Sequence, residues 1–223
     1  MNTTPSQYVT VRSVRWHADH LFELCVARDD VAFVPGDCVA LFHRDEAASR
    51  PYSIASGVNE DELRFLIRRL PAGTVSADLA RRVPGDRIRM SPPFGWFRPG
   101  QVGDFASAAF VATGTGIAPF LSYLRSFPAQ PPRICLYGVR RQADAVAADW
   151  VAQRCPLKLA VSRERVPSAH HGRVTDLLEA LPLEPLLHYY LCGLDTMLTE
   201  VSDWLTARGV TADRIHRECF FNA

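Results

Sequence analysis

The hydrophobic pattern of this chain changes near residue 102, and that change restricts the folds open to it. Before this point, short runs rich in β-forming residues are separated by turn signals such as Pro35-Gly36-Asp37 and Pro84-Gly85-Asp86. After it, apolar runs of strand length alternate with segments of helical length. The first pattern is typical of a closed antiparallel barrel. The second is typical of a parallel sheet covered by helices on both faces.

A length of 223 residues suits two domains of this kind. We expect residues 1–102 to form a six-stranded antiparallel Greek-key barrel and residues 103–223 a five-stranded parallel α/β domain, with the boundary at Arg98-Pro99-Gly100-Gln101. The barrel strands are expected at Tyr8–Trp16, Leu21–Ala27, Asp37–Leu41, Arg50–Ala55, Leu63–Arg68 and Arg87–Met90, with a helical insert at Ser76–Arg82. The later strands are expected at Ala108–Thr113, Arg133–Tyr137, Leu157–Val161, Leu187–Cys192 and Arg214–Glu218. The later helices are expected at Ile117–Ser126, Ala143–Arg154, Val174–Leu181 and Asp195–Arg208.

Composition excludes several classes of function. No run approaches the roughly 18 consecutive apolar residues of a membrane span, and the first residues lack the pattern of a secretion signal. We therefore expect a soluble, cytoplasmic protein, and a monomer. The 25 Lys and Arg residues nearly balance the 24 Asp and Glu residues, which argues against nucleic acid as the main partner. The six cysteines are too far apart for metal-ligand spacing, so we expect free thiols and no metal.

A glycine-containing turn stands where the first strand of the second domain meets its first helix. It reads Thr113-Gly114-Thr115-Gly116-Ile117-Ala118-Pro119. Glycines allow a backbone to approach a pyrophosphate closely, Pro119 suits the first turn of a helix, and a helix N-terminus presents free N–H groups to an anion. The motif differs from G-x-G-x-x-G, because Pro119 stands where the third glycine would be. Taken alone, the motif is equally compatible with an ordinary structural turn.

Five segments, in this order, resemble the ferredoxin–NADP+ reductase family: RPYSIAS, GTVS, ATGTGIAPF, YLCG and a near-terminal Glu-x-Phe. The resemblance covers most of the chain, from about residue 35 onward. It implies FAD bound on the barrel, NADP(H) bound on the α/β domain, and hydride transfer between the two cofactors.

The resemblance also implies which residues hold the flavin. In RPYSIAS, Arg50 would bind the FAD diphosphate, Tyr52 would pack beside the flavin, and Ser53 would lie close to its reactive nitrogen; Pro51 belongs to the same segment. Gly73, Thr74, Val75 and Ser76 would present N–H groups and hydroxyls to the pyrophosphate. An aromatic ring near the C-terminus would cover the flavin and swing aside for the nicotinamide. The resemblance suggests Phe220 for this ring, although Phe221 is an alternative.

For the nicotinamide cofactor, the resemblance implies Cys192, Gly193 and Glu218 beside the nicotinamide, with Thr113, Gly114, Thr115, Gly116 and Pro119 at the phosphates. Ser53, Cys192 and Glu218 would then be the catalytic residues. Four polar residues match NADP-specific members of the family: Arg140, Ser162, Arg163 and Arg173. Because Lys158 is the only lysine, arginine is the usual cation of this chain, and any single arginine is weak evidence.

The resemblance further implies ferredoxin or flavodoxin as the electron carrier, and we expect no fused iron–sulfur module. A docking patch for an acidic carrier is expected among the arginines that crowd the later part of the barrel sequence: Arg64, Arg68, Arg69, Arg81, Arg82 and Arg87. Two alternatives stay open. One is an NAD(P)H-dependent reductase of free flavin or of an oxygenase partner, and the other is a non-catalytic nucleotide-binding module.

Overall fold

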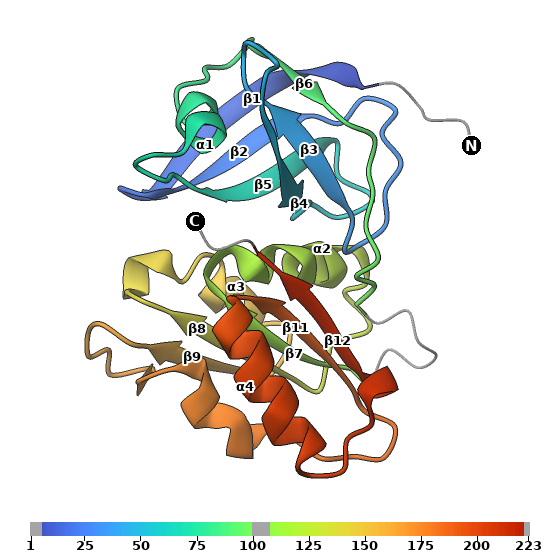
Figure 1. The fold of residues 1–223 in the computed structure, drawn as a ribbon, viewed down its shortest axis with the longest axis vertical. Coiled ribbons are helices and arrows are strands. Elements are labelled where there is room, and N and C mark those ends of the chain that lie inside the picture. The colour runs from blue at the N-terminus through green and yellow to red at the C-terminus, as the bar shows by residue number, and fades with distance from the viewer. Residues whose placement is uncertain (1–5, 100–107, 221–223) are drawn as a thin grey trace.

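The computed structural model describes residues 6–99 and 108–220, and Figure 1 shows them as two domains stacked one on the other. The expected boundary between residues 102 and 103 lies outside the described residues. Six strands before this gap form one sheet and six strands after it form another. Fold class and order of the domains are therefore as expected.

The first domain is an antiparallel barrel with the strand order β4-β3-β6-β1-β2-β5. The two strands at the ends of this order, β4 and β5, close the barrel. Just after β4, the Ala55 N–H donates to the carbonyl of Arg64 in β5 at 2.8 Å. A short helix, α1 (Thr74–Leu79), follows β5, and its Val75 and Leu79 belong to the barrel core. The strands are β1 (Gln7–Ala18), β2 (Leu21–Ala27), β3 (Cys38–Phe42), β4 (Ser49–Ser53), β5 (Glu62–Arg68) and β6 (Arg87–Met90).

The second domain is a parallel sheet with the order β10-β9-β8-β7-β11-β12. Along β7, Phe110 packs into the core on one face of the sheet while Val111 packs into the core on the other, because side chains of a strand alternate between faces. Both faces are thus covered, as the continuous apolar runs predict. The strands are β7 (Ala108–Thr113), β8 (Ile134–Val139), β9 (Leu157–Val161), β10 (His170–His171), β11 (His188–Gly193) and β12 (Ile215–Cys219).

Helices and 3-10 turns cover this sheet. The α-helices are α2 (Ala118–Ser126), α3 (Ala148–Ala152) and α4 (Asp195–Thr206). The 3-10 turns are η2 (Gly114–Ile117), η3 (Gln142–Asp144), η4 (Val174–Ala180) and η5 (Ala212–Arg214).

Three details of the second domain differ from the sequence-based expectation. A sixth strand, the two-residue β10, pairs with the edge of β9. The helix expected at 143–154 is interrupted at Ala147, whose φ of +59° is left-handed and cannot continue a helix, so only η3 and α3 form. The helix expected at 174–181 is the 3-10 segment η4, in which only Val174 and Leu178 are buried. Two buried side chains anchor this segment less firmly than the full apolar stripe of a long α-helix would.

The two domains share a hydrophobic core. Leu66 and Phe97 from the barrel side pack in one cluster with Phe110 and Phe120 of the α/β domain. The rings of Phe97 and Phe120 are 5.8 Å apart, as are those of Phe97 and Tyr190. The interface therefore resembles a domain interior, which restricts hinge motion between the two units.

Polar contacts cross the same junction at its edges. His20 Nε2, in the turn between β1 and β2, lies 2.9 Å from a carboxylate oxygen of Asp144 in η3. Arg125 of α2 pairs with Glu60 of the barrel at 3.3 Å. The Val58 N–H donates to the Ser126 hydroxyl at 3.1 Å. These contacts fix the relative placement of the two domains around the site described next.

Candidate active site

Ser53, Cys38 and Glu218 meet where the barrel faces the α/β domain. Ser53 is the last residue of β4 and pairs directly with Cys38, the first residue of β3. The Cys38 Sγ lies 3.3 Å from the Ser53 Oγ and 3.2 Å from the Glu218 Oε1. Glu218 is on β12, which runs up to the junction in Figure 1. The Cys38–Glu218 hydrogen bond therefore joins the two domains inside the site.

Cys192 lies on the other side of the same carboxylate. It pairs with Glu218 in the register of the parallel strands β11 and β12, and its Sγ is 4.0 Å from the Glu218 Oε2. The structure thus brings together all three residues that the resemblance implies as catalytic: Ser53, Cys192 and Glu218. Ligands of open α/β sheets bind at this carboxyl edge of the strands.

Burial controls the protonation of this group. Together with the charge of the nearby Glu218 carboxylate, it raises the pKa of the Cys38 thiol to about 12. Burial also raises the pKa of Glu218, while donation from Cys38 and the charge of Arg98 oppose that change. Burial raises the pKa of the Cys192 thiol well above its usual range. At neutral pH both thiols are therefore protonated hydrogen-bond donors rather than thiolates.

All six cysteines are free thiols, as expected. The sequence did not, however, identify Cys38 as a residue of the site. Its position opposite Ser53 depends on the pairing register of β3 and β4, which neither segment encodes alone. The one available signal was Pro35-Gly36-Asp37, a turn that ends directly before Cys38.

The segment Arg50–Ser53 presents different side chains to different environments. Arg50 and Pro51 are exposed, Tyr52 is half-buried against the barrel core, and Ser53 is buried. The Arg50 guanidinium donates to the Ser49 carbonyl at 2.8 Å, which leaves other N–H groups of the fork facing outward. Burial raises the pKa of Tyr52 to about 12, so its hydroxyl stays protonated. A cation, an aromatic ring and a hydroxyl on one strand fit the diphosphate, the ring system and the polar edge of FAD.

The turn Gly73–Ser76 fits the expected phosphate role only in part. Thr74 is exposed, and among the described residues no side chain caps the start of α1. Val75, however, is buried in the barrel core, and the Ser76 Oγ accepts a hydrogen bond from the Leu70 N–H at 3.2 Å. Thr74 is therefore open to a ligand, whereas the Gly73 N–H donates to the Leu70 carbonyl at 3.0 Å and, with the side chains of Val75 and Ser76, holds the turn.

The turn after β7 packs against the end of β11. A Cβ added at Gly116 would overlap the Cys192 carbonyl oxygen, so this glycine serves close packing of protein against protein. Gly114 has a φ of +53° and open space around its Cα, so this glycine serves the backbone turn. The Thr113 Oγ1 accepts from the Leu194 N–H at 2.9 Å, while Pro119 is buried in the first turn of α2. The loop therefore leads through η2 into the helix, with Thr115 and Gly114 partly exposed.

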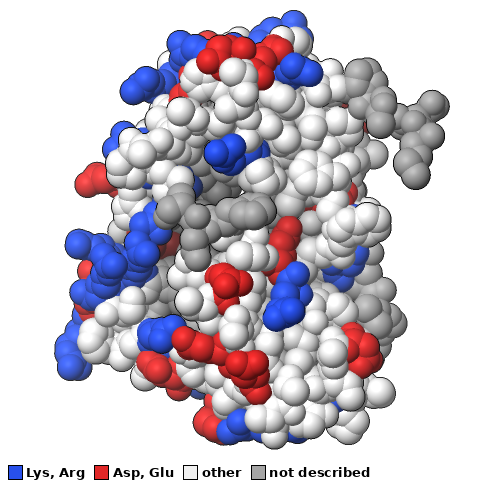
Figure 2. All heavy atoms as spheres, viewed as in Figure 1, with Lys and Arg blue, Asp and Glu red and all other residues white. Residues whose placement is uncertain are grey.

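The four residues expected at the adenosine phosphate separate into two groups. Arg140 and Arg163 lie close together, since the Arg163 N–H donates to the Arg140 carbonyl at 2.8 Å. Burial, together with the charges of Arg68 and Arg163, lowers the pKa of Arg140. Figure 2 shows cationic side chains gathered at one edge of the molecule near the domain junction.

The other two residues are engaged within the protein. The Arg173 guanidinium pairs with Glu200 at 2.7 Å, and the Ser162 hydroxyl donates to the Val139 carbonyl at 3.3 Å. Arg140 and Arg163 are consequently better placed than Arg173 to receive a phosphate.

The C-terminal aromatic lies at the same edge of the sheet. The Phe220 N–H donates to the Gly193 carbonyl at 3.0 Å, and its ring packs on the core that the domains share. The alternative, Phe221, lies outside the described residues.

Two of the six arginines expected to form a docking patch are paired with carboxylates of the protein itself. Arg64 is surrounded by Glu23, Glu60 and Glu62, and Arg82 pairs with Asp78 at 2.7 Å. These carboxylates neutralise two of the six cations, which the spacing in sequence did not reveal. Arg68 instead adds its charge to that of Arg140.

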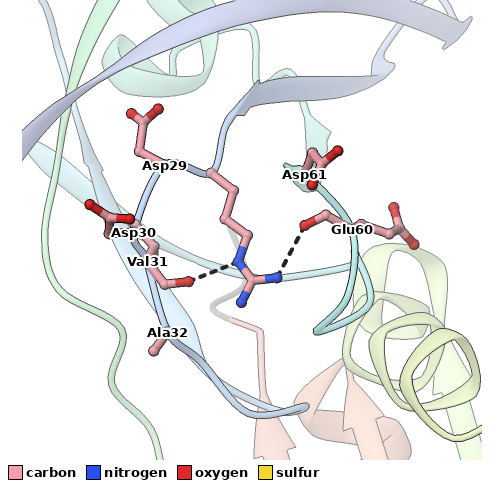
Figure 3. A pocket seen from close by; sticks show the side chains of 7 residues that line it. Asp29, Asp30, Val31, Ala32, Glu60 and Asp61 are labelled. Carbon is pink, nitrogen blue, oxygen red and sulfur yellow. Dashed lines mark hydrogen bonds between the residues drawn. The ribbon is translucent and has the colours of Figure 1, made fainter.

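A surface pocket of about 430 Å³ lies at the edge of the barrel, apart from the Ser53–Glu218 group. Arg28 lines this pocket and donates to the carbonyls of Val31 at 2.9 Å and Glu60 at 3.1 Å. Figure 3 shows Val31 and Glu60 on opposite sides of the pocket, each with one of these hydrogen bonds. Four acidic residues also line it: Asp29, Asp30, Glu60 and Asp61. Arg28 ties two loops together there, which is a structural role.

Within residues 6–99 and 108–220, no helix is both long and apolar enough to cross a membrane. In the same part of the chain, no three His, Cys, Asp or Glu side chains are grouped so that they could hold a metal ion.

Comparisons with known proteins agree with this architecture. Residues 14–98 match the model of the oxidoreductase FAD-binding domain, and residues 110–203 match that of the oxidoreductase NAD-binding domain. The toluate 1,2-dioxygenase electron transfer component of Pseudomonas putida is 30% identical over 203 residues, which cover 86% of this chain and 60% of that protein. The flavodoxin/ferredoxin–NADP reductase of Shigella flexneri is 26% identical over 212 residues, covering 85% of this chain and 86% of the relative.

Solved structures show the same fold. A ferredoxin–NADP+ reductase from Neisseria gonorrhoeae with bound FAD and NADP superposes with a TM-score of 0.88 at 22% identity, covering 98% of this chain and 100% of that one. The cytochrome P450 reductase GcoB of Amycolatopsis gives 0.84 at 27% identity, covering 98% of this chain and 71% of that one. This chain spans about three fifths of several dioxygenase relatives, 60% and 59% of the first two. The two family models cover most of the chain in the expected order, and the chain therefore belongs to the ferredoxin reductase-like family of FAD- and NAD-binding oxidoreductases.

Proposed function

We propose that this protein is an FAD-dependent reductase that transfers hydride between NADP(H) and FAD and exchanges electrons between FAD and a ferredoxin or flavodoxin. The observation that carries the proposal is the meeting of Ser53, Cys192 and Glu218 across the domain junction. These residues come from two domains, one for each cofactor, so their common position is where the two reacting rings would meet. When bound, the flavin supplies the hydride and single-electron chemistry.

The residues of this chain supply binding and orientation. Arg50 and the N–H group of Thr74, at the start of α1, hold the diphosphate. Tyr52 packs on the ring system with its hydroxyl protonated. The Ser53 hydroxyl is fixed by the Cys38 thiol at 3.3 Å. Cys192, buried and protonated, fills the wall behind the nicotinamide position and keeps water from it.

Glu218 closes the site from the side of the α/β domain. Its carboxylate lies between the two thiols, at 3.2 Å from Cys38 and 4.0 Å from Cys192, and can accept a hydrogen bond from the nicotinamide carboxamide. Phe220 follows on the same strand edge, and its ring or that of Phe221 would cover the flavin until the nicotinamide enters. Ring movement of this type often limits turnover.

NADP(H) is proposed over NAD(H) because Arg140 and Arg163 stand together after neighbouring strands. An NAD site favours an acidic residue that accepts the ribose hydroxyls, whereas a 2′-phosphate needs cations. The partly buried Arg140, whose pKa is lowered by burial and by neighbouring arginines, is stabilised when an anion binds. The experiment is a comparison of kcat/KM for NADPH and NADH, and a preference for NADH would reject this part of the proposal.

A second electron acceptor is favoured by the relatives themselves. The toluate and anthranilate relatives are electron transfer components of dioxygenases, which supports an oxygenase partner as the alternative acceptor. Free flavin is the other acceptor to be tested. These functions are separated by a panel of acceptors offered to the NADPH-reduced protein: flavodoxin, ferredoxin, an oxygenase component and free FMN.

We also propose that the protein acts as a monomer in the cytoplasm. Gel filtration tests the oligomeric state, and cell fractionation tests the location.

The central experiment is anaerobic mixing of the purified, FAD-loaded protein with NADPH while the flavin absorbance is followed. Rapid bleaching is expected. Protein that binds no flavin when reconstituted with FAD, yet retains nucleotide, would instead be a non-catalytic nucleotide-binding module. Protein that binds FAD but is bleached by neither NADPH nor NADH would reject the hydride-transfer function.

A further inference from the structure

One cysteine thiol from each domain contacts the Glu218 carboxylate. Cys38 of the barrel lies 3.2 Å from Oε1, and Cys192 of the α/β domain lies 4.0 Å from Oε2. Cys192 is on the strand next to Glu218, so its position follows from the sheet. Cys38 is different, because it reaches Glu218 from the other domain.

The backbone around Cys38 is held on both sides. Its N–H donates to the Phe94 carbonyl at 2.7 Å, and the Phe94 N–H donates back to the Cys38 carbonyl at 2.8 Å. On its other side, Cys38 pairs with Ser53 in the β3–β4 ladder. Cys38 is only 8% exposed. Because its backbone is held on both sides, the Cys38 thiol can fix the orientation of a neighbouring side chain.

We infer that Cys38 is a positioning residue whose thiol donates a hydrogen bond to Glu218 and so holds this carboxylate of the α/β domain against Ser53 of the barrel. This inference rests on the proposed function and deepens it, since Ser53 and Glu218 are its proposed catalytic residues. Cys38 touches neither cofactor in the proposal and acts through these two side chains.

The charged and titratable groups around Glu218 agree with this role. Cys38 and Arg98 stabilise the carboxylate, Asp37 opposes it, and Cys192 remains protonated beside it. Arg98 is itself paired with Asp37 at 2.8 Å, so the charges of these two largely compensate each other. The direct contact from the barrel that stabilises the Glu218 carboxylate is therefore the hydrogen bond from the Cys38 thiol. Removing this donor should raise the pKa of Glu218, because the charged form loses a hydrogen bond while burial remains.

The test is an infrared titration of the Glu218 carboxyl in the cofactor-free protein, with Glu218→Gln used to assign the band. In Cys38→Ala the midpoint is expected to rise by about one pH unit. In Cys38→Ser, which keeps a donor, it should stay close to that of the unsubstituted protein. If Cys38→Ala does not fold, Cys38→Val carries the same expectation, because a β-branched residue suits a strand.

Cys25 offers a matched control. It is a buried barrel thiol that also faces a carboxylate, Glu23, at 3.7 Å, but it lies outside the site. Cys25→Ala should leave the Glu218 midpoint unchanged. An equal shift in Cys25→Ala, or no shift in either apolar variant of Cys38, overturns the inference. Because this titration needs no cofactor, its outcome is independent of whether the protein transfers hydride.

The FAD-loaded protein gives a second readout. Cys38→Ala should slow flavin reduction by saturating NADPH on the order of tenfold, because small displacements of aligned groups reduce rates strongly. The Kd for NADPH should change little, and Cys38→Ser should restore most of the rate. A tenfold loss that Cys38→Ser does not restore would also overturn the inference.

Discussion

The Thr113 Oγ1 occupies the space in which Gly193 would carry a Cβ. The two residues end the neighbouring parallel strands β7 and β11, and Thr113 also accepts a hydrogen bond from the next residue, Leu194, at 2.9 Å. Gly193 has a φ of +142°, a conformation that L side chains rarely adopt. Close contact of these two strand ends shapes the floor of the candidate site.

Gly193→Ala should therefore destabilise the protein strongly. Backbone strain and the overlap with Thr113 together are expected to lower the free energy of unfolding by about 3 kcal/mol or more. Gly209→Ala is the control, because Gly209 has a φ of +82° but nothing within 4 Å of its added Cβ. It should lose only about 1–2 kcal/mol, the strain of the backbone alone. Denaturant unfolding measures both, and equal losses would show that the overlap with Thr113 is unimportant.

Ser53→Ala should slow flavin reduction and leave FAD bound. The hydroxyl is buried and held by Cys38 at 3.3 Å, so its removal affects orientation at the reacting edge rather than the diphosphate contacts. We expect a loss on the order of tenfold to a hundredfold in the rate constant for reduction by NADPH, measured by stopped flow.

Ser56→Ala provides the comparison for Ser53. Ser56 is a buried serine of the same segment, and its Oγ accepts from the Arg64 N–H at 3.2 Å, away from the site. This variant should lose about 1 kcal/mol of stability and keep its reduction rate. If both serine variants slowed reduction equally, Ser53 would have no special place in the reaction.

Glu218→Gln should alter how stability depends on pH. Burial raises the pKa of Glu218 in the folded protein above its ordinary value of 4.5. The folded state therefore holds this proton more tightly than the unfolded state, and stability falls as pH rises from about 4.5 through the raised pKa. Gln cannot ionise, so the stability of the variant relative to the unsubstituted protein should increase across that window. Urea unfolding at a series of pH values checks this, and a constant difference would contradict it.

Arg163→Ala should change the choice of nicotinamide cofactor. We expect kcat/KM for NADPH to fall on the order of tenfold to a hundredfold, since a charge-assisted contact to the 2′-phosphate is lost, while kcat/KM for NADH changes little. Arg208→Ala is the control, because this arginine pairs with Glu179 at 2.9 Å on the surface. Equal losses with both nucleotides would place Arg163 outside the phosphate site.

The strands could be predicted well from the sequence because their apolar runs are bounded by clear turns. Leu21–Ala27 and Leu157–Val161 have the expected bounds. The proximity of Cys192 to Glu218 could also be predicted, because parallel strands place their carboxyl ends at one edge of a sheet.

Other features depend on tertiary structure and could not be predicted. The position of Cys38 is set by cross-strand register, and the left-handed Ala147 interrupts a segment with an ordinary helical pattern. Gly116 was expected to make room for a phosphate, yet its Cα faces the Cys192 carbonyl of a strand far along the chain. The residues around a glycine in the sequence do not show which distant residue it will contact in the fold.

The apolar cluster in which Leu66 and Phe97 pack with Phe110 and Phe120 makes the two domains energetically interdependent. Either half produced alone would expose these rings to water and lose their burial. Heating should accordingly melt the whole molecule in a single cooperative transition. For the same reason, replacing one domain with that of a relative would require that both sides of this cluster be exchanged together.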